Sequence, residues 1–255
     1  MIGFILGTSE GKDFLRGLKD FQERIVVSTA TEYGGELLSE FDVAHVNTKP
    51  LDEKELKEFI KRFNLKVLVD ASHPYAKNVS ENALKACKEL KIEYIRYERS
   101  GVLTKLEDEN IIRISSLQEL KNIDSDINGT LLNTTGSNGI KTILNLNLKN
   151  RVIHRVLPSI KVMNDIFELG VRVEDIIAIK GPIGYELNKA FIKEYNAKAL
   201  LTKDSGIRGG ALEKAKAALD SNIKLVILEK PKVKYGKSFS SIDETINYTK
   251  RVLNK

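Results

Sequence analysis

Short apolar runs alternate with amphipathic segments along most of the chain. Several of the apolar runs are continuous in Ile, Val and Leu, which is typical of parallel strands that are buried on both faces. The pattern predicts strands over 2–6, 25–29, 66–70, 94–97, 130–133, 151–156, 176–180, 199–202 and 224–228. It predicts helices over 53–63, 79–90, 138–144, 185–195, 211–219 and 241–253.

This alternation favours an α/β fold of the doubly wound type. The rhythm breaks in the polar segment 115–130 and then restarts. The two halves also resemble each other: "FILGTSEG" and "LLNTTGSNG" both run from a strand through a small polar turn to a helix, and "VLVDASHP" matches "ALLTKDSG" in layout. We therefore predict two Rossmann-like lobes, at 1–125 and 126–255, whose parallel sheets face a central cleft.

Composition and cysteine usage narrow the class of protein. The chain has 255 residues, of which 42% are hydrophobic and 30% charged, as in ordinary globular proteins. Its one cysteine, Cys87, excludes an intrachain disulfide framework and a Cys-rich metal site, and it lies on an apolar helix stripe with Ala83 and Leu90. The first apolar run is too short for a secretory leader or a membrane span. We expect a cytoplasmic protein without a metal site.

The net charge of +6 comes from 41 Lys and Arg against 35 Asp and Glu. Many of the lysines alternate with acids on predicted helix faces, which is typical of a solvated surface. No zinc finger, RNP-like aromatic pattern or basic arm indicates nucleic acid. An anionic small molecule accounts for the charge at least as well.

Ligands of open parallel sheets bind beyond the carboxyl ends of the strands, and here those ends are polar. The loop Gly7-Thr8-Ser9-Glu10-Gly11 suits a pyrophosphate, although it lacks the dinucleotide and Walker fingerprints and equally suits a tight turn. The second strand ends at Ser28-Thr29, without an acid for an adenosine ribose. This omission favours a 2′-phosphorylated cofactor, although no arginine is obviously placed to bind it.

Other predicted strand ends carry titratable side chains. His73 precedes Pro74, which restricts it to extended conformations, so it is either a catalytic group or a cap. His45 and His154 are weaker candidates. Arg96, Glu98 and Arg99 follow one strand, Thr134-Thr135-Gly136-Ser137 follows another, and Arg151 and Arg155 share a face of a third. Any one arginine is more often a solvated charge, but several at strand ends strengthen the case for an anion site.

These segments together resemble one family, the precorrin-6A reductases of cobalamin biosynthesis. The resemblance covers nearly the whole chain and rests on an ordered set of motifs: "GTSEG", "VDASHPYA", "RYERS", "LLNTTGSNG", "HRVLP", "IKGPIG", "LLTKDSGIRGG", "EKAKAA" and "VILEKP". Two departures concern the loops. Leu6 stands where members often have a second glycine, and the bulky Ile207 and Arg208 follow Gly206.

The resemblance implies NADPH- or NADH-dependent reduction of the C18–C19 double bond of an anionic corrin precursor, with hydride delivered to C19, in a cleft between the lobes. It implies catalytic roles for Asp204, His73 and Lys203, with Asp204, His73 or a bound water as proton donor. A composition rich in Lys, Ile and Asn favours an anaerobe and hence the cobalt-bearing substrate. No obligate protein partner is evident. The implied cofactor contacts are Gly7, Thr8, Ser9, Glu10, Ser28, Thr29, Thr135, Gly136 and Ser137, and the implied substrate contacts are Tyr75, Arg99, Arg155, Lys203 and Ser205.

Two other functions fit a two-lobed fold. One is a transferase that uses a nucleotide-linked donor, but no D-x-D metal motif stands at a predicted strand end. The other is a non-catalytic ligand-binding protein. A missing signal peptide argues against a periplasmic receptor, and a missing DNA-binding module argues against a repressor.

Overall fold

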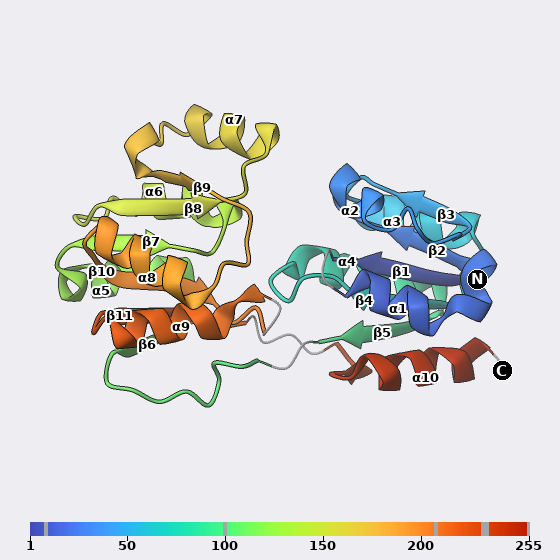
Figure 1. Ribbon diagram of the computed structural model, residues 1–255. Coiled ribbons are helices and arrows are strands. Elements are labelled where there is room, and N and C mark those ends of the chain that lie inside the picture. The colour runs from blue at the N-terminus through green and yellow to red at the C-terminus, as the bar shows by residue number, and fades with distance from the viewer. Residues whose placement is uncertain (8–9, 99–100, 207–208, 231–234, 254–255) are drawn as a thin grey trace. The chain divides into compact units, whose positions relative to one another are not determined.

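The structure is a computed structural model that describes residues 1–7, 10–98, 101–206, 209–230 and 235–253 (Figure 1). The chain forms two compact units. Unit 1 comprises Met1–Ser100 and Pro231–Lys255, and unit 2 comprises Gly101–Lys230. Each unit is built on one parallel sheet, so the predicted α/β architecture is confirmed.

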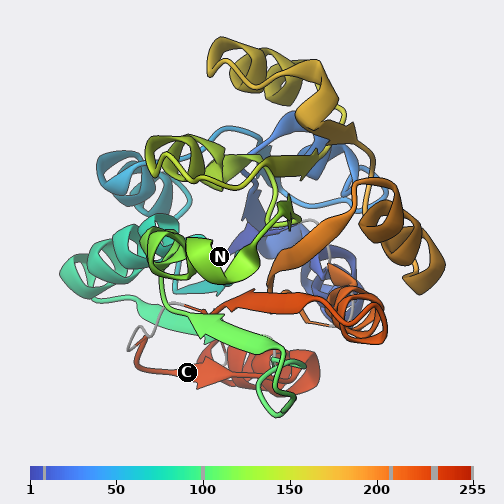
Figure 2. The same ribbon diagram turned by 90° about the vertical axis from the view of Figure 1, so that its left-hand side faces the viewer.

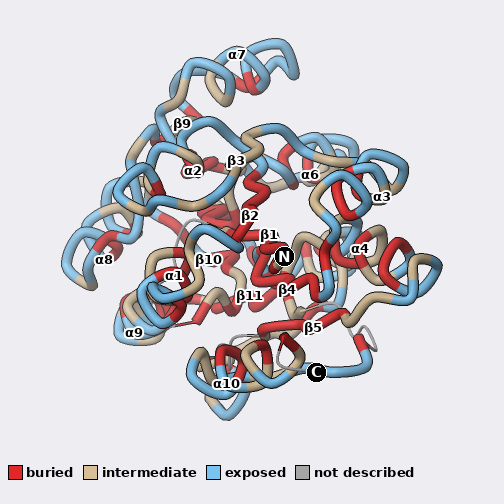
Figure 3. Tube along the Cα trace, turned by 90° about the vertical axis from the view of Figure 1, so that its right-hand side faces the viewer, coloured by how far each residue is buried: buried red, intermediate tan, exposed pale blue. Residues whose placement is uncertain are grey.

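Unit 1 has a sheet in the order β12-β5-β4-β1-β2-β3. Successive side chains of a strand point to opposite faces, and the core follows this alternation. Phe4 and Val69 pack with Phe14 and Ile246 on one face, whereas Ile5 packs on the other with α3 and α4. Figure 3 shows the strands β1, β4 and β5 as largely buried. The strands are β1 (Ile2–Leu6), β2 (Ile25–Ser28), β3 (His45–Asn47), β4 (Val67–Ala71), β5 (Glu93–Tyr97) and β12 (Ser238–Phe239), and the α-helices are α1 (Gly11–Gly17), α2 (Glu32–Glu36), α3 (Glu53–Arg62), α4 (Lys77–Leu90) and α10 (Ile242–Leu253).

Unit 2 repeats this plan with the order β6-β11-β10-β7-β8-β9, and helices cover both faces of its sheet (Figures 1 and 2). Leu200 and Ile227 pack with residues of α8 and α9 on one face. The strands are β6 (Ile111–Ile114), β7 (Thr130–Asn133), β8 (Val152–Val156), β9 (Ile176–Ala178), β10 (Ala197–Lys203) and β11 (Lys224–Leu228), and the α-helices are α5 (Leu120–Ile127), α6 (Ile140–Asn145), α7 (Ile160–Glu168), α8 (Tyr185–Glu194) and α9 (Ala211–Asp220).

The boundaries between the two units lie after residues 100 and 230, and not at the predicted position 125/126. The segment 115–130 is part of unit 2, where α5 buries Leu120 and Ile127. The side chain of Asp124 in this helix accepts hydrogen bonds from the Lys149 amide at 2.7 Å and from Asn150 Nδ2 at 2.7 Å. Its polar residues therefore serve internal hydrogen bonds and do not form a linker.

The C-terminal segment also differs from the predicted division. β12 pairs in parallel with β5, and α10 packs Ile246 and Leu253 into the core of unit 1. After the chain has completed unit 2, it therefore returns to finish the first sheet. Sequence order alone does not reveal this return.

Cys87 is 1% exposed on the apolar stripe of α4, as predicted. Burial raises the pKa of its thiol to about 12, with a smaller contribution from the Asp70 charge. The thiolate that a nucleophile needs is therefore disfavoured.

A buried ion pair joins β4 to β5 in unit 1. Arg96 Nη1 lies 2.7 Å from Asp70 Oδ1, and both side chains are fully buried. Tyr94 Oη donates to Asp70 Oδ2 at 2.8 Å, and the Arg96 guanidinium stands 5.1 Å from the centroid of the Tyr235 ring. Arg96 also donates to Ser72 Oγ at 3.0 Å. The pair thus holds the loop that follows β4.

We expect Arg96→Met to lower the free energy of unfolding by roughly 3–5 kcal/mol, because the Asp70 carboxylate stays buried without its counter-ion. The double variant D70N/R96M should recover part of this loss. Lys85→Met is the control, since Lys85 is 65% exposed and lies 3.9 Å from Glu53. Urea unfolding followed by circular dichroism measures all three. An R96M protein as stable as K85M would contradict this interpretation.

Candidate active site

The first candidate loop follows β1 in unit 1. The Gly7 amide donates to Ala71 O at 3.3 Å, which ties the end of β1 to that of β4. Glu10 is 5% exposed, and α1 begins directly after it. A Cβ at Gly11 would stand 3.2 Å from side-chain atoms of both Leu6 and Leu38, so glycine lets the helix approach the sheet closely. Thr8 and Ser9 lie outside the described residues.

Ser28 and Thr29 lie at the carboxyl end of β2, as predicted, but their hydroxyls serve the protein itself. Ser28 Oγ accepts a hydrogen bond from Asn47 Nδ2 at 3.0 Å. Thr29 Oγ1 donates to Thr31 O at 3.0 Å, and Thr31 caps α2. Both residues are nearly inaccessible, at 5% and 3% exposure. Their side chains therefore shape the turn.

The loop after β4 presents His73 to solvent. His73 Nδ1 accepts the Tyr75 amide at 3.3 Å, and the two rings lie 5.6 Å apart between centroids. Ser72 beside it is held by Arg96 and donates its amide to Asp70 Oδ1 at 3.0 Å. The buried ion pair therefore fixes the backbone from which His73 projects. Arg99, predicted nearby in sequence, lies outside the described residues.

In unit 2 the corresponding turn follows β7. The amide and hydroxyl of Thr135 donate to Asn133 Oδ1 at 3.0 and 2.7 Å. Gly136 has a φ of 86°, a conformation that favours glycine, and no atom lies within 4 Å of the position of an added Cβ. Ser137 then starts the short 3₁₀ helix that leads into α6. This turn leaves room for a ligand beside Gly136.

Asp204, at the end of β10, holds a distant segment of unit 2. Its carboxylate accepts the amides of Val102 at 3.0 Å and Leu103 at 2.9 Å. A Cβ at Gly101 would stand 2.5 Å from Asp204 Oδ2. The contacts make Asp204 an anchor for the 101–104 segment.

Ser205 packs just as closely within the same loop. A Cβ at Gly209 would stand 2.0 Å from Ser205 Oγ, so the loop requires glycine at that position. Gly206 and Gly210 have φ values of 74° and 64°. The described residues on either side of 207–208 therefore need glycine at particular positions, which a simple polar turn does not require.

Three cations gather at this edge of unit 2: Arg155 from β8, Lys203 from β10 and Lys214 from α9. Arg155 is 8% exposed, and its Nη1 donates to Asn188 Oδ1 at 2.8 Å. Burial lowers the pKa of Arg155 to about 10 and also lowers that of Lys203. Burial and then the charge of Arg155 lower the pKa of Lys214 to about 8, and the attraction of Glu213 outweighs only the smaller repulsion of Lys203. A site with this charge suits an anion.

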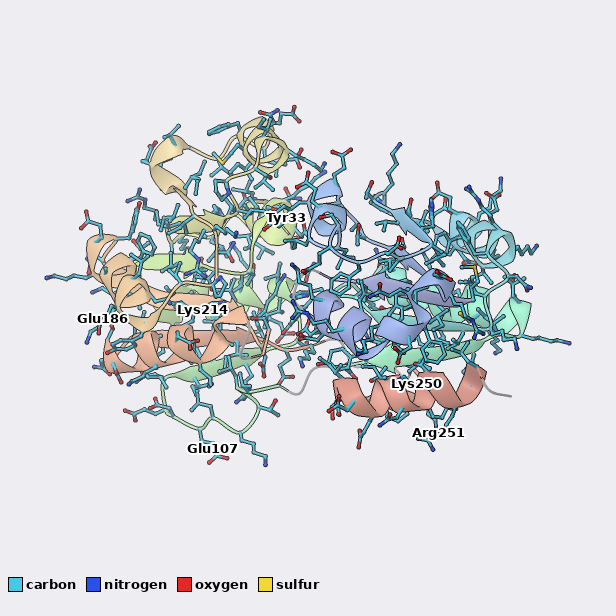
Figure 4. All side chains as sticks on the ribbon, turned by 45° about the vertical axis from the view of Figure 1, so that its right-hand side comes forward. Tyr33, Glu107, Glu186, Lys214, Lys250 and Arg251 are labelled. Carbon is cyan, nitrogen blue, oxygen red and sulfur yellow. The ribbon has the colours of Figure 1, made fainter. Side chains whose placement is uncertain are left out.

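Sequence reasoning missed Lys214. It lies in "EKAKAA", where lysines read as the solvated face of a helix, yet it shares the buried face with Ala211, Ala215 and Ala218. Its position on that apolar stripe is the signal that was available. Figure 4 labels it on α9.

His154 belongs to the core. It is 1% exposed, and its Nδ1 pairs with Asn133 Nδ2 at 3.1 Å. Burial lowers its pKa to about 4 despite the opposing attraction of Asp175.

No group of three or more His, Cys, Asp or Glu side chains among the described residues is arranged to hold a metal ion. None of the described helices combines the length and the apolar composition needed to cross a lipid bilayer.

Comparisons with known proteins identify one family of reductases. The family described as Precorrin-6x reductase CbiJ/CobK matches residues 2–250. The Cobalt-precorrin-6A reductase of Methanocaldococcus jannaschii is 39% identical over 248 residues, 95% of each chain. That of Methanothermobacter thermautotrophicus is 32% identical and covers 97% of this chain and 82% of its own. The solved structure titled CobK precorrin-6A reductase aligns with a TM-score of 0.75 at 14% identity, over 98% of this chain and 96% of its own, and so supports the fold.

The buried neutral His154 makes stability depend on pH. Its pKa falls from 6.5 to about 4 on folding, so the unfolded chain binds more protons between these values. This contribution is complete above pH 6.5 and is lost as pH falls toward 4, by about 3 kcal/mol. Urea unfolding at several pH values should therefore give a shallower pH dependence for His154→Gln than for the wild type. Equal slopes would contradict the assignment.

Proposed function

Because the chain belongs to the Precorrin-6x reductase CbiJ/CobK family, we propose that it reduces the macrocycle of cobalt-precorrin-6A to that of cobalt-precorrin-6B with a nicotinamide cofactor. One observation of this chain itself supports the proposal: cations are buried at the carboxyl edge of the sheet in unit 2. A corrin precursor carries several acetate and propionate carboxylates. Arg155 and Lys203 would bind such groups in a water-poor setting, where charge-assisted hydrogen bonds are strong.

The residues present fit a dinucleotide. The Gly7–Gly11 loop leads from a buried parallel strand into a closely packed helix, and the open space at Gly136 admits a ligand beside Thr135 and Ser137. We infer that these two loops hold the cofactor. When bound, the nicotinamide supplies the hydride that C19 of the macrocycle receives.

We favour NADPH over NADH. β2 ends at Ser28, and Thr29-Ala30-Thr31 follows without an acidic side chain to bind an unphosphorylated ribose. The hydroxyls of Ser28 and Thr29 form hydrogen bonds within the protein that stabilise this turn. The turn would therefore bind the adenosine end of the cofactor through its backbone groups.

The protein must also deliver one proton, because a hydride and a proton together saturate the C18–C19 bond. Asp204 is engaged by two backbone amides, which supports an anchoring role. His73 is exposed at a strand tip, and a ring whose Nδ1 accepts the Tyr75 amide carries its proton on Nε2 when neutral. We therefore propose His73 as the proton donor. Tyr75, whose ring lies beside that of His73, would contact the macrocycle.

No observation favours the two alternatives that the sequence left open. A nucleotide-donor transferase and a non-catalytic binding protein are both poor matches to a family of reductases.

The reaction itself is the first test. Purified protein mixed with cobalt-precorrin-6A and NADPH should oxidise the cofactor, with a loss of absorbance at the nicotinamide band that depends on the macrocycle. NADH in a parallel assay should give a lower kcat/KM. If neither cofactor is oxidised, the proposed function is wrong, and a preference for NADH would overturn the cofactor choice alone.

The proton donor is tested by His73→Gln. We expect kcat to fall about 100-fold, since general acid catalysis contributes effects of this order, while the KM for NADPH stays near the wild-type value. His45→Gln is the matched control, because His45 stacks on Phe63 away from the strand ends and should leave kcat unchanged. Wild-type turnover by H73Q would remove His73 from this role.

A further inference from the structure

Lys214 lies where a helix meets the loop after β10. α9 begins after Gly210, and that N-terminus has no side-chain cap. A Cβ at Gly210 would stand 3.1 Å from Pro182 Cβ, so the loop packs tightly there. The Lys214 amide donates to Gly210 O at 3.3 Å, which places its side chain in the first turn of the helix.

The Lys214 side chain is buried with little compensation from the protein. The residue is 5% exposed. Among the described residues no hydrogen bond or ion pair within 4.0 Å is made by its Nζ, and the one opposite charge acting on it is that of Glu213, although a buried lysine normally has a close partner. A buried cation among other cations is costly in the free protein, so a ligand that supplies an anion there is favoured.

The groups that act on Lys214 come from three elements. Arg155 on β8 and Lys203 on β10 repel its charge, while Glu213 on its own helix attracts it. From α8 the neutral Asn188 holds Arg155 in place, since Asn188 itself donates to Gly184 O at 2.8 Å. The net charge of the groups that act on Lys214 is therefore positive.

We propose that Lys214 and Arg155 together bind an anionic oxygen group of a ligand, and that this binding is coupled to protonation of Lys214. The proposal rests on the proposed function for the identity of the ligands. The group is either a side-chain carboxylate of the macrocycle or a phosphate of the cofactor, because both offer the same charge and acceptor oxygens. An anion beside Lys214 offsets the repulsion from Arg155 and Lys203 and so stabilises the ammonium form.

The sign of the coupling follows from the free protein. The pKa of Lys214 is about 8 there, so at pH 7 the side chain is mostly charged and at pH 9 mostly neutral. Affinity for the anion should therefore fall about tenfold between pH 7 and pH 9. Arginine keeps its charge over this range, so K214R should bind with little dependence on pH.

The experiment compares wild type with K214M, K214R and K216M. Lys216 is the matched control because it is an exposed lysine of the same helix, 5.0 Å from the Tyr185 ring. Calorimetry gives the Kd of NADP⁺ and of cobalt-precorrin-6A at pH 7 and pH 9. K214M should weaken one or both at pH 7 by about tenfold or more, whereas K216M should match the wild type. Weaker binding of the macrocycle alone identifies a carboxylate, and of NADP⁺ alone a phosphate.

Two results would overturn the proposal: equal Kd values for wild type and K214M with both ligands, or the same loss of affinity with pH in K214R as in the wild type. A purely structural role is separated by thermal unfolding of the free protein. K214M should melt at a higher temperature, because it removes a buried charge that Arg155 and Lys203 repel, whereas loss of a supporting contact would lower the melting temperature. Failure of the proposed function appears differently, as absence of macrocycle-dependent NADPH oxidation by the wild type.

Discussion

Parallel pairing of every strand is the constraint on which the rest of the structure depends. In both sheets each described pair of neighbours runs in the same direction. Parallel strands require crossover connections, and the helices in those crossovers bury both faces of the sheet. Polar side chains are then confined largely to the strand ends, and all carboxyl ends in one sheet lie at one edge. The residues that carry chemistry are collected there by topology alone.

The two sheets use buried charge at that edge in different ways. Unit 1 buries opposite charges, Asp70 and Arg96, which compensate each other and fix the loop that carries His73. Unit 2 gathers like charges, and burial, followed by repulsion from Arg155 and Lys203, lowers the pKa of Lys214. The first arrangement is complete within the protein and supports a neighbouring loop. The second is stabilised when an anion arrives.

This difference explains what the sequence could and could not predict. Continuous apolar runs such as 224–228 locate buried parallel strands, and the polar residues after them locate the edge. The segment 115–130 reads as a break because its Asp124 and neighbouring polar residues are hydrogen-bonded to partners more than twenty positions away. Lys214 reads as a solvated lysine because its burial depends on how α9 packs on the sheet. The hydrogen bonds of Asp124 and the burial of Lys214 both depend on residues far away in the sequence. A local sequence pattern therefore cannot predict them.

Adjacent residues of one strand end take opposite roles for the same reason. Lys203 is the last residue of β10 and Asp204 follows it, and the two side chains meet different neighbours. Asp204 is held by the amides of Val102 and Leu103, in the segment where the chain enters unit 2. The partly buried Lys203 lies near the buried cations Arg155 and Lys214. Because Lys203 and Asp204 are consecutive, the group of cations and the anchor of residues 101–104 are joined by a single peptide bond.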